Sequence, residues 1–267
     1  MTTHDLRATA VTVGFDDREV IHALDLAVPD GSITVIVGPN ACGKSTLLRT
    51  LARLLRPTSG ETTLDGKPLR DYRGRQLATS IGLLPQQPIA PDGITVEDLV
   101  TRGRYPRQGI FGQRTAADVI AVQAALIATD TAELATRRVE ELSGGQRQRV
   151  WIAMALAQET DILLLDEPTT YLDVTHQIEV LDLLVELNHR AGTTIVMVLH
   201  DLNLAARYAD HMVVMADGRI VAEGHPATVV TTQTVREAFA LESLVVEDPV
   251  SGSPMVVPMG RFHTVVS

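Results

Sequence analysis

The hydrophobic and polar positions of the chain follow two patterns. Between residues 6 and 28 apolar and polar side chains alternate, which predicts strands of an antiparallel β layer with one buried face. Continuous apolar runs at 33–37, 162–165 and 194–199 instead have the length of strands that are buried on both faces. A helical pattern follows the first of these runs, so we predict an α/β fold.

The pattern changes between residues 88 and 136, where strand signals vanish and helices are predicted at 95–101 and 116–128. Thr95 is the expected N-cap of the first helix, because its hydroxyl can accept a hydrogen bond from the first turn. We therefore expect an inserted helical subdomain. The remaining predicted elements are a hairpin strand at 61–64, a strand at 81–84, a hairpin over 211–223, a helix at 231–239 and a small hairpin within 244–257.

One loop, at residues 38–46, carries the first candidate chemistry. It matches G-x-x-x-x-G-K-[ST] between the apolar run at 33–37 and a helical pattern at 47–51. Glycines let backbone N–H groups turn toward phosphates, Lys44 adds a full charge, and Ser45 offers a hydroxyl to Mg²⁺. A Gly-rich turn without a nucleotide is the alternative, but the strand–loop–helix context favours nucleotide binding. The loop reads Gly38, Pro39, Asn40, Ala41, Cys42, Gly43, Lys44, Ser45 and Thr46.

A second candidate site lies at the predicted start of another helix. Ser143 is followed by Gly144, Gly145 and Gln146, ahead of an apolar helical stripe at 150–156. A plain N-cap explains the serine, but it does not explain two consecutive glycines, which weaken the first turn of a helix. We therefore expect a second anion site at this helix N-terminus.

Side chains that can carry out acid–base chemistry follow two of the buried runs. Asp166 and Glu167 end one run, and His200 ends another. Active residues of open α/β sheets collect at the carboxyl ends of strands, and a purely structural carboxylate would not need a neighbour of like charge. Asp166 suits the outer coordination shell of Mg²⁺, and Glu167 suits a general base for an attacking water. A lone histidine is more often structural, but this position favours contact with the phosphates.

The amino-acid composition limits the classes of protein to which this chain can belong. The 267 residues, 45% of them hydrophobic, suffice for one large α/β domain. A net charge of −10 argues against nucleic acid as a partner, because phosphate-binding surfaces need an excess of Lys and Arg. The single cysteine excludes a disulfide framework and fits a reducing cytoplasm. We find neither a signal region nor an apolar run of the roughly 20 residues that span a bilayer, so work at a membrane is expected through a partner.

The loop at 38–46 and the run at 142–146 together resemble the ATP-binding subunits of ABC transporters, over nearly the whole chain. The second run is specific, since kinases and GTPases have the loop without it. The resemblance implies a RecA-like P-loop core, an antiparallel β subdomain and a helical subdomain that carries the signature run. Within a single ABC ATPase domain it assigns about 1–86 and 159–240 to the core and β subdomain, about 87–158 to the helical subdomain and about 241–267 to a C-terminal extension.

The resemblance also implies roles for single residues. Lys44, Ser45 and Thr46 match the contacts to phosphate and Mg²⁺, and Gln86 matches the Q-loop residue that touches Mg²⁺ and signals to the membrane subunit. Further matches are Asp166 and Glu167 to the Walker B pair, Asp173 to the D-loop, and His200 to the switch histidine. Catalytic roles thus fall on Glu167, His200, Lys44, Gln86 and Asp173, metal contacts on Ser45, Gln86 and Asp166, and nucleotide contacts on Phe15, residues 38–46, Ser143, Gly144, Gly145 and Gln146.

Two positions depart from the pattern of the family. Phe15 stands where the family usually has a tyrosine that stacks on adenine, and it keeps the aromatic face; the alternative is an aromatic that packs on a neighbour. Ala41 replaces a usual glycine. If this position needs a positive φ, alanine costs about 1 kcal/mol there.

Residues 103–106 and the tail at 248–258 resemble the ATPases of iron–siderophore, haem and cobalamin importers. In that family two copies form a head-to-tail dimer, with each ATP between one phosphate loop and the partner's signature run. The dimer docks under two membrane permeases, and a substrate-binding protein delivers the chelate from outside. The resemblance implies an ATP-hydrolysing subunit of an iron-chelate importer at the cytoplasmic face of the membrane. Alternatives are a haem or cobalamin importer, an exporter, or a soluble ABC ATPase without a transport role.

Overall fold

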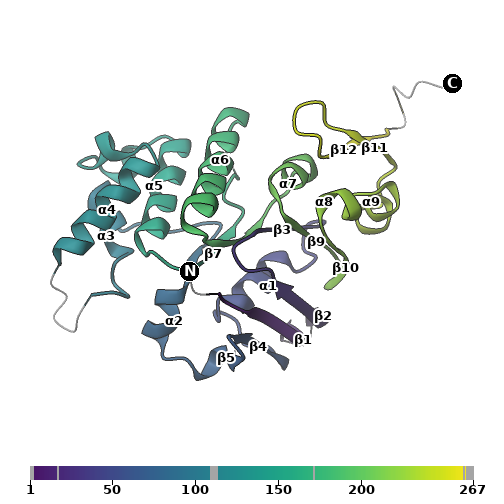
Figure 1. Cartoon of the computed structure of the whole chain (residues 1–267), viewed down its shortest axis with the longest axis horizontal. Coiled ribbons are helices and arrows are strands. Elements are labelled where there is room, and N and C mark those ends of the chain that lie inside the picture. Colours follow the sequence, from purple (N-terminus) through teal and green to yellow (C-terminus); the bar gives the residue numbers. More distant parts are fainter. Residues whose placement is uncertain (1–2, 17, 109–113, 171, 261, 263–267) are drawn as a thin grey trace. The chain divides into compact units, whose positions relative to one another are not determined.

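The computed structural model describes residues 3–16, 18–108, 114–170, 172–260 and 262 (Figure 1). It forms two compact units: residues 70–195, here named the signature unit, and residues 2–69 with 196–267, here named the phosphate-loop unit. In the described part of the chain, no helix combines the length and apolar character that crossing a bilayer requires. The three-part division made from the sequence stays a prediction.

The phosphate-loop unit begins with the antiparallel layer that the alternating pattern predicts. The register between the first two strands shifts at three places, and two of these shifts are β-bulges at Ala10 and Ala23, which both have positive φ. Side chains satisfy the displaced amides: Ala10 N–H donates to Asp25 Oδ1 at 2.8 Å, and Ala23 N–H donates to Thr12 Oγ1 at 3.0 Å. The sheet has the order β2-β1-β4-β5 and consists of β1 (Leu6–Phe15), β2 (Arg18–Val28), β4 (Ser59–Leu64) and β5 (Lys67–Pro68).

The same unit contains part of a mainly parallel sheet. All five residues of its first strand are buried, as the continuous apolar run predicts. The strand order in this unit is β10-β9-β3-β8, with an antiparallel hairpin at the edge. The elements are β3 (Ile33–Val37), α1 (Lys44–Leu51), β8 (Thr194–Val198), α7 (Leu202–Tyr208), β9 (His211–Ala216), β10 (Arg219–Gly224), α8 (Pro226–Val229) and α9 (Thr232–Phe239).

The C-terminal stretch folds as the predicted hairpin, β11 (Ser243–Glu247) with β12 (Pro254–Pro258). It is fastened to α7, because Asn203 accepts from Val256 N–H at 2.8 Å and donates to the Val256 carbonyl at 3.3 Å. The Asp248 carboxylate binds the Arg207 guanidinium at 2.6 Å. Hydrogen bonds from the Val250 N–H, the Ser251 hydroxyl and Arg207 hold the pKa of Asp248 well below its usual range.

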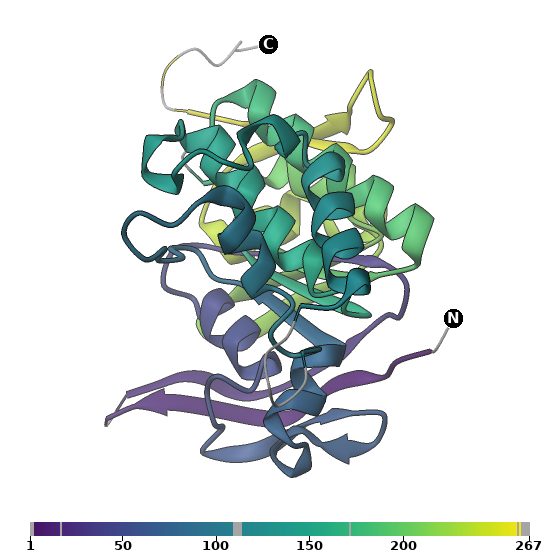
Figure 2. The same cartoon turned by 90° about the vertical axis from the view of Figure 1, so that its left-hand side faces the viewer.

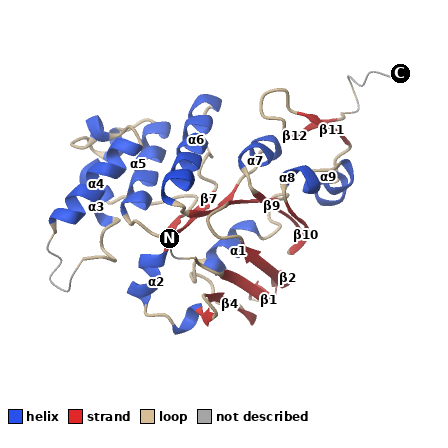
Figure 3. Ribbon diagram, viewed as in Figure 1, coloured by secondary structure: helices blue, strands red, loops and turns tan. Residues whose placement is uncertain are grey.

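The signature unit holds the helical region predicted from residue 88 onward (Figures 2 and 3). Thr95 caps α3 as expected, and Thr115 forms a capping box with Asp118 at the start of α4. Its strands have the order β8-β7-β6, and the boundary between the two units falls within β8. The elements are α2 (Gly74–Ser80), β6 (Ile81–Leu84), α3 (Val96–Arg102), α4 (Ala116–Ala128), α5 (Gly144–Ala157), β7 (Ile162–Asp166) and α6 (Val174–Ala191).

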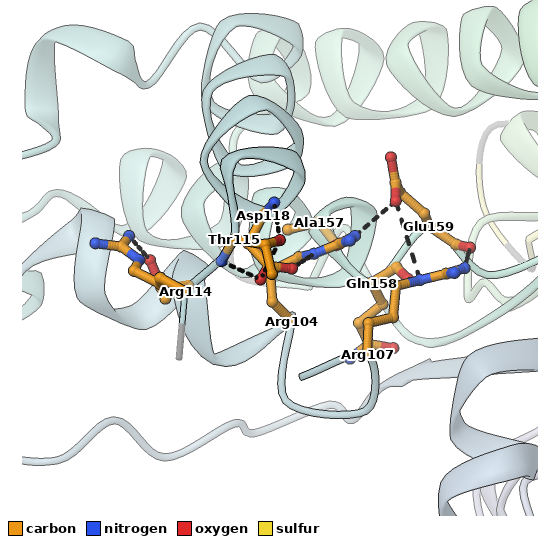
Figure 4. A network of polar contacts seen from close by, with 9 residues as sticks. Arg104, Arg107, Arg114, Thr115, Asp118, Ala157, Gln158 and Glu159 are labelled. Atoms are coloured by element: carbon orange, nitrogen blue, oxygen red, sulfur yellow. Dashed lines mark hydrogen bonds and ion pairs between the residues drawn. The ribbon is translucent and has the colours of Figure 1, made fainter. Parts of the chain in front are cut away.

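A buried polar network joins the end of α3 to α4 and to the end of α5 (Figure 4). Arg104 Nε donates to Asp118 Oδ1 at 2.9 Å, and Nη1 donates to the Ala157 carbonyl and to Glu159 Oε2, both at 2.7 Å. At Gly103, directly after α3, a Cβ would lie 2.2 Å from the carbonyl oxygen of Met154 on α5, so only glycine fits here. Gly103 and Arg104, which belong to the stretch 103–106 that resembles the importer ATPases, therefore have a structural role.

Candidate functional site

The phosphate loop follows β3 and is shaped by glycine. A Cβ at Gly38 would lie 2.2 Å from the Met215 carbonyl oxygen, so the close approach of β9 excludes any side chain. Gly43, with φ 105, is the N-cap of α1, and no side-chain hydrogen bond caps the helix. The positive end of α1 is therefore presented without a competing side-chain acceptor, as an anion site requires.

Lys44 is buried inside this loop. Its Nζ donates to the carbonyl oxygens of Gly38 and Pro39, both at 2.8 Å. The ammonium thus spans the turn from the beginning of α1 and holds the loop in its curved shape. Burial raises the pKa of the adjacent Cys42 thiol, and the nearby Lys44 charge offsets part of that rise.

Ala41 has φ 61, so the condition set by the sequence analysis is met. A Cβ in the left-handed region meets the following carbonyl oxygen. We expect Ala41→Gly to raise the free energy of unfolding by about 1 kcal/mol, as measured by urea denaturation. Ala124→Gly, on the exposed face of α4, is the matched control and should lower stability by about 0.5–1 kcal/mol. Equal destabilisation by both changes would show that Ala41 is unstrained.

Two further predicted contacts lie in the phosphate-loop unit. Phe15 ends β1 opposite Arg18 and is 49% exposed, so its ring is available to a ligand. His200 is exposed, two residues after the end of β8, and precedes Asp201, which caps α7 by accepting from the N–H groups of Asn203 and Leu204. Adenine stacking by Phe15 and a phosphate contact by His200 stay predictions.

In the signature unit, β7 ends at Asp166, the first of the two predicted carboxylates, and Glu167 follows it. Asp166 and Glu167 are both buried, and Glu167 adopts φ 56, a left-handed conformation that costs about 1–3 kcal/mol in a non-glycine residue. The Glu167 Oε2 atom accepts a hydrogen bond from Gln86 Nε2 at 2.5 Å and one from Thr170 Oγ1 at 3.0 Å. The parallel pairing of β6 and β7 explains the first contact, since it aligns the segments that carry Gln86 and Glu167.

The signature run forms the N-terminal turn of α5. Ser143 Oγ accepts from Gln146 N–H at 3.3 Å, and Gln146 Oε1 accepts from Ser143 N–H at 3.1 Å, which completes a capping box. A Cβ at Gly145 would lie 2.8 Å from the ring of His176 on α6. A side chain at position 145 would have to displace the His176 ring, so close packing is a second reason, beside an anion site, for one of the two glycines.

Asp173 is the N-cap of α6. It accepts from His176 N–H at 3.0 Å and contacts His176 Nδ1 at 2.7 Å, and these contacts lower the pKa of Asp173. Gln148, on α5, donates to the Pro168 carbonyl beside Glu167 at 2.7 Å. His176, Gln148 and Thr170 were not identified from the sequence, although the three-residue spacing from Asp173 to His176 is that of a capped first turn.

A groove of about 280 Å³ opens next to the segment that follows Gln86. Its lining includes Trp151 and Arg147 on α5 and Ile89, which is 91% exposed. The lining residues are Pro88, Ile89, Ala90, Pro91, Asp92, Val139, Glu140, Arg147 and Trp151.

The site residues thus fall into two groups. Gln86 and Glu167 are in direct contact, and the signature turn meets the helix that Asp173 caps. Lys44, Ser45, Phe15 and His200 belong to the phosphate-loop unit. Phosphoryl transfer to water needs a phosphate-binding loop, a positive charge near the phosphates and a group that can activate the water. The candidates for these parts are the glycine-shaped loop, the enclosed Lys44 and the buried Glu167 carboxylate.

The similarity of this chain to known proteins is consistent with phosphoryl transfer to water. The family model described as "ABC transporter" matches residues 21–170. The chain is 52% identical over 256 residues to a probable siderophore transport system ATP-binding protein of Bacillus subtilis (strain 168), covering 96% of this chain and 93% of the relative. It is 50% identical over 256 residues to the ferric enterobactin transport ATP-binding protein of Escherichia coli (strain K12), covering 96% and 94%.

Among solved structures, an inward-facing metal-chelate type ABC transporter matches with a TM-score of 0.83 and 28% sequence identity, over 97% of this chain and 98% of that one. The agreement includes the predicted fold class, an α/β cassette with an antiparallel β subdomain. The chain therefore belongs to the ABC transporter family, as one of the ATP-binding subunits that hydrolyse ATP.

Proposed function

We propose that this chain powers the uptake of an iron–siderophore chelate through a membrane permease. The observation that carries the proposal is the extent of the similarity to siderophore and ferric enterobactin transport proteins, which covers 96% of the chain in both cases. The metal-chelate type transporter matches 97% of the chain, a share that requires alignment of much of the C-terminal extension.

The proposed ATP site assigns the base to Phe15 and the phosphates to the loop amides and Lys44. Ser45, Gln86 and Asp166 are the proposed Mg²⁺ contacts, and their hydroxyl, amide and carboxylate oxygens are hard donors of the kind this ion takes. Mg²⁺, when bound, neutralises charge on the β- and γ-phosphates. The phosphate-loop amides and Lys44 orient the γ-phosphate for in-line attack.

Glu167 is the proposed general base. Its carboxylate accepts a proton from the attacking water, while Lys44 and His200 stabilise the charge on the γ-phosphate. The buried position of Glu167 and its hydrogen bonds from Gln86 and Thr170 support this role, because they orient the carboxylate. Asp173, beside the signature turn, is proposed to act where two copies meet.

The proposed working form is a head-to-tail dimer in which Ser143, Gly144 and Gly145 of one copy contact the ATP held by the other. The uncapped start of α1 and the capped start of α5 supply the two helix N-termini that such a shared site needs. The groove beside Gln86 is the proposed contact with the permease, at the cytoplasmic face of the membrane. Its exposed Ile89 and the Arg147 charge suit an amphipathic partner segment.

Uptake into proteoliposomes tests the proposed substrate. The vesicles contain this chain with its permease, and the substrate-binding protein is added outside with a ferric siderophore, haem or cobalamin. We expect ATP-dependent uptake of the ferric siderophore, and we expect no uptake by vesicles that contain the Lys44→Ala variant. Uptake of haem or cobalamin alone would overturn the siderophore assignment, and ATP hydrolysis without uptake of any of the three would overturn the import role.

A further inference from the structure

Thr170 contacts Glu167 through both its main chain and its side chain. Its N–H donates to the Glu167 carbonyl oxygen at 3.2 Å, and its hydroxyl donates to Glu167 Oε2 at 3.0 Å. The two residues therefore close a four-residue turn in which the last side chain binds the first. The main-chain bond alone would close this turn, so the hydroxyl contact calls for a separate explanation.

The local backbone gives a reason for that contact. Glu167 leaves β7 in a left-handed conformation, with φ 56, and its long side chain then has three rotatable bonds. A conformation so far from that of the strand does not by itself fix where the carboxylate points. Hydrogen bonds to Oε2 help to fix it, and those from Gln86 and from Thr170 are among them.

The two donors differ in how they are connected to Glu167. Gln86 lies 81 residues away, on the segment that continues into the groove lined by residues 88–92. Thr170 lies three residues away, inside the same turn. A displacement of the segment after β6 would remove the amide of Gln86, whereas the Thr170 hydroxyl would stay with the carboxylate.

On the basis of the proposed role of Glu167, we propose that Thr170 is a positioning residue for the general base. Its hydroxyl holds the carboxylate in the orientation that accepts the proton of the attacking water, including when Gln86 moves. The hydroxyl contacts neither ATP nor the water in this proposal. Its removal should therefore affect the chemical step and leave ATP binding unchanged.

Steady-state ATP hydrolysis by the full chain tests this proposal with Thr170→Val, Thr170→Ala and Thr170→Ser. We expect kcat to fall about 10- to 100-fold in the Val and Ala variants, with the KM for ATP within about twofold of wild type. Thr170→Ser keeps the hydroxyl and should stay within about threefold of the wild-type kcat. Thr79→Val is the matched control, because the Thr79 hydroxyl donates to the Gln76 carbonyl on exposed α2.

Equal kcat values in the Ala, Val and Ser variants would overturn the proposal, as would a loss that appears in KM alone. The Ala and Ser pair keeps the test valid if valine disturbs the turn. Glu167→Gln, measured in parallel, separates this inference from the proposed function. If Glu167→Gln is inactive and Thr170→Ala is fully active, only the positioning role fails; if Glu167→Gln is fully active, the assignment of the base fails as well.

Discussion

Replacing Glu167 with glutamine is expected to lower the turnover of ATP by about 10²- to 10⁴-fold while ATP binding persists. The amide has nearly the shape of the carboxylate but cannot accept the proton of the attacking water. Glu167 is buried and adopts a costly backbone conformation, features that cluster at active sites. Turnover is measured as phosphate release, and binding is measured with a fluorescent ATP analogue.

A matched control is Glu133→Gln, at an exposed position of the same unit, which should leave turnover unchanged. The Glu167→Gln variant should also accumulate as an ATP-bound dimer in gel filtration with Mg²⁺, because closure is no longer followed by hydrolysis. Wild-type turnover in this variant would exclude Glu167 as the general base.

Replacing Arg104 with methionine is expected to lower the free energy of unfolding by about 3 to 5 kcal/mol, in the range found for broken buried ion pairs. The side chains of Arg104 and Asp118 are only 5% and 4% exposed. Methionine would leave the Asp118 charge without its guanidinium partner and the Ala157 carbonyl without that donor. The backbone N–H of Thr115, followed by Arg104, lowers the pKa of Asp118, so this carboxylate is charged near neutral pH.

Urea denaturation measures the loss at Arg104. Arg190→Met removes an exposed ion pair with Glu186 on α6 and should cost less than about 1 kcal/mol. The double variant Arg104→Met with Asp118→Leu should recover part of the stability, because both charges are then absent. Equal costs for Arg104→Met and Arg190→Met would show that the buried network contributes no more than a surface pair.

Features that depend on a short stretch of sequence were predictable. The continuous apolar runs identified β3 and β7, and polar residues ahead of helical patterns identified the N-caps Thr95 and Ser143. α6 was missed although its signals are local: Asp173 caps it, Gly192 ends it in a left-handed conformation, and its buried positions follow a helical period.

Features that depend on distant contacts were not predictable in the same way. The bulges at Ala10 and Ala23 need a facing strand and a polar side chain to satisfy the displaced amide. From the sequence alone, Gly145 is explained by an anion site, because its packing against His176 is visible only in the structure. The contact of Gln86 with Glu167 spans 81 residues and depends on the pairing of β6 with β7.

ATP is proposed to be hydrolysed in a site shared by two copies, and a mixture of two inactive variants tests this arrangement. Lys44→Ala disables the phosphate loop, and Ser143→Arg disables the signature turn. A dimer of one copy of each retains one site with an intact loop and an intact partner turn. The mixture is expected to regain ATP hydrolysis that neither variant shows alone. A mixture that stays inactive, although the two variants form mixed dimers, would contradict the shared site.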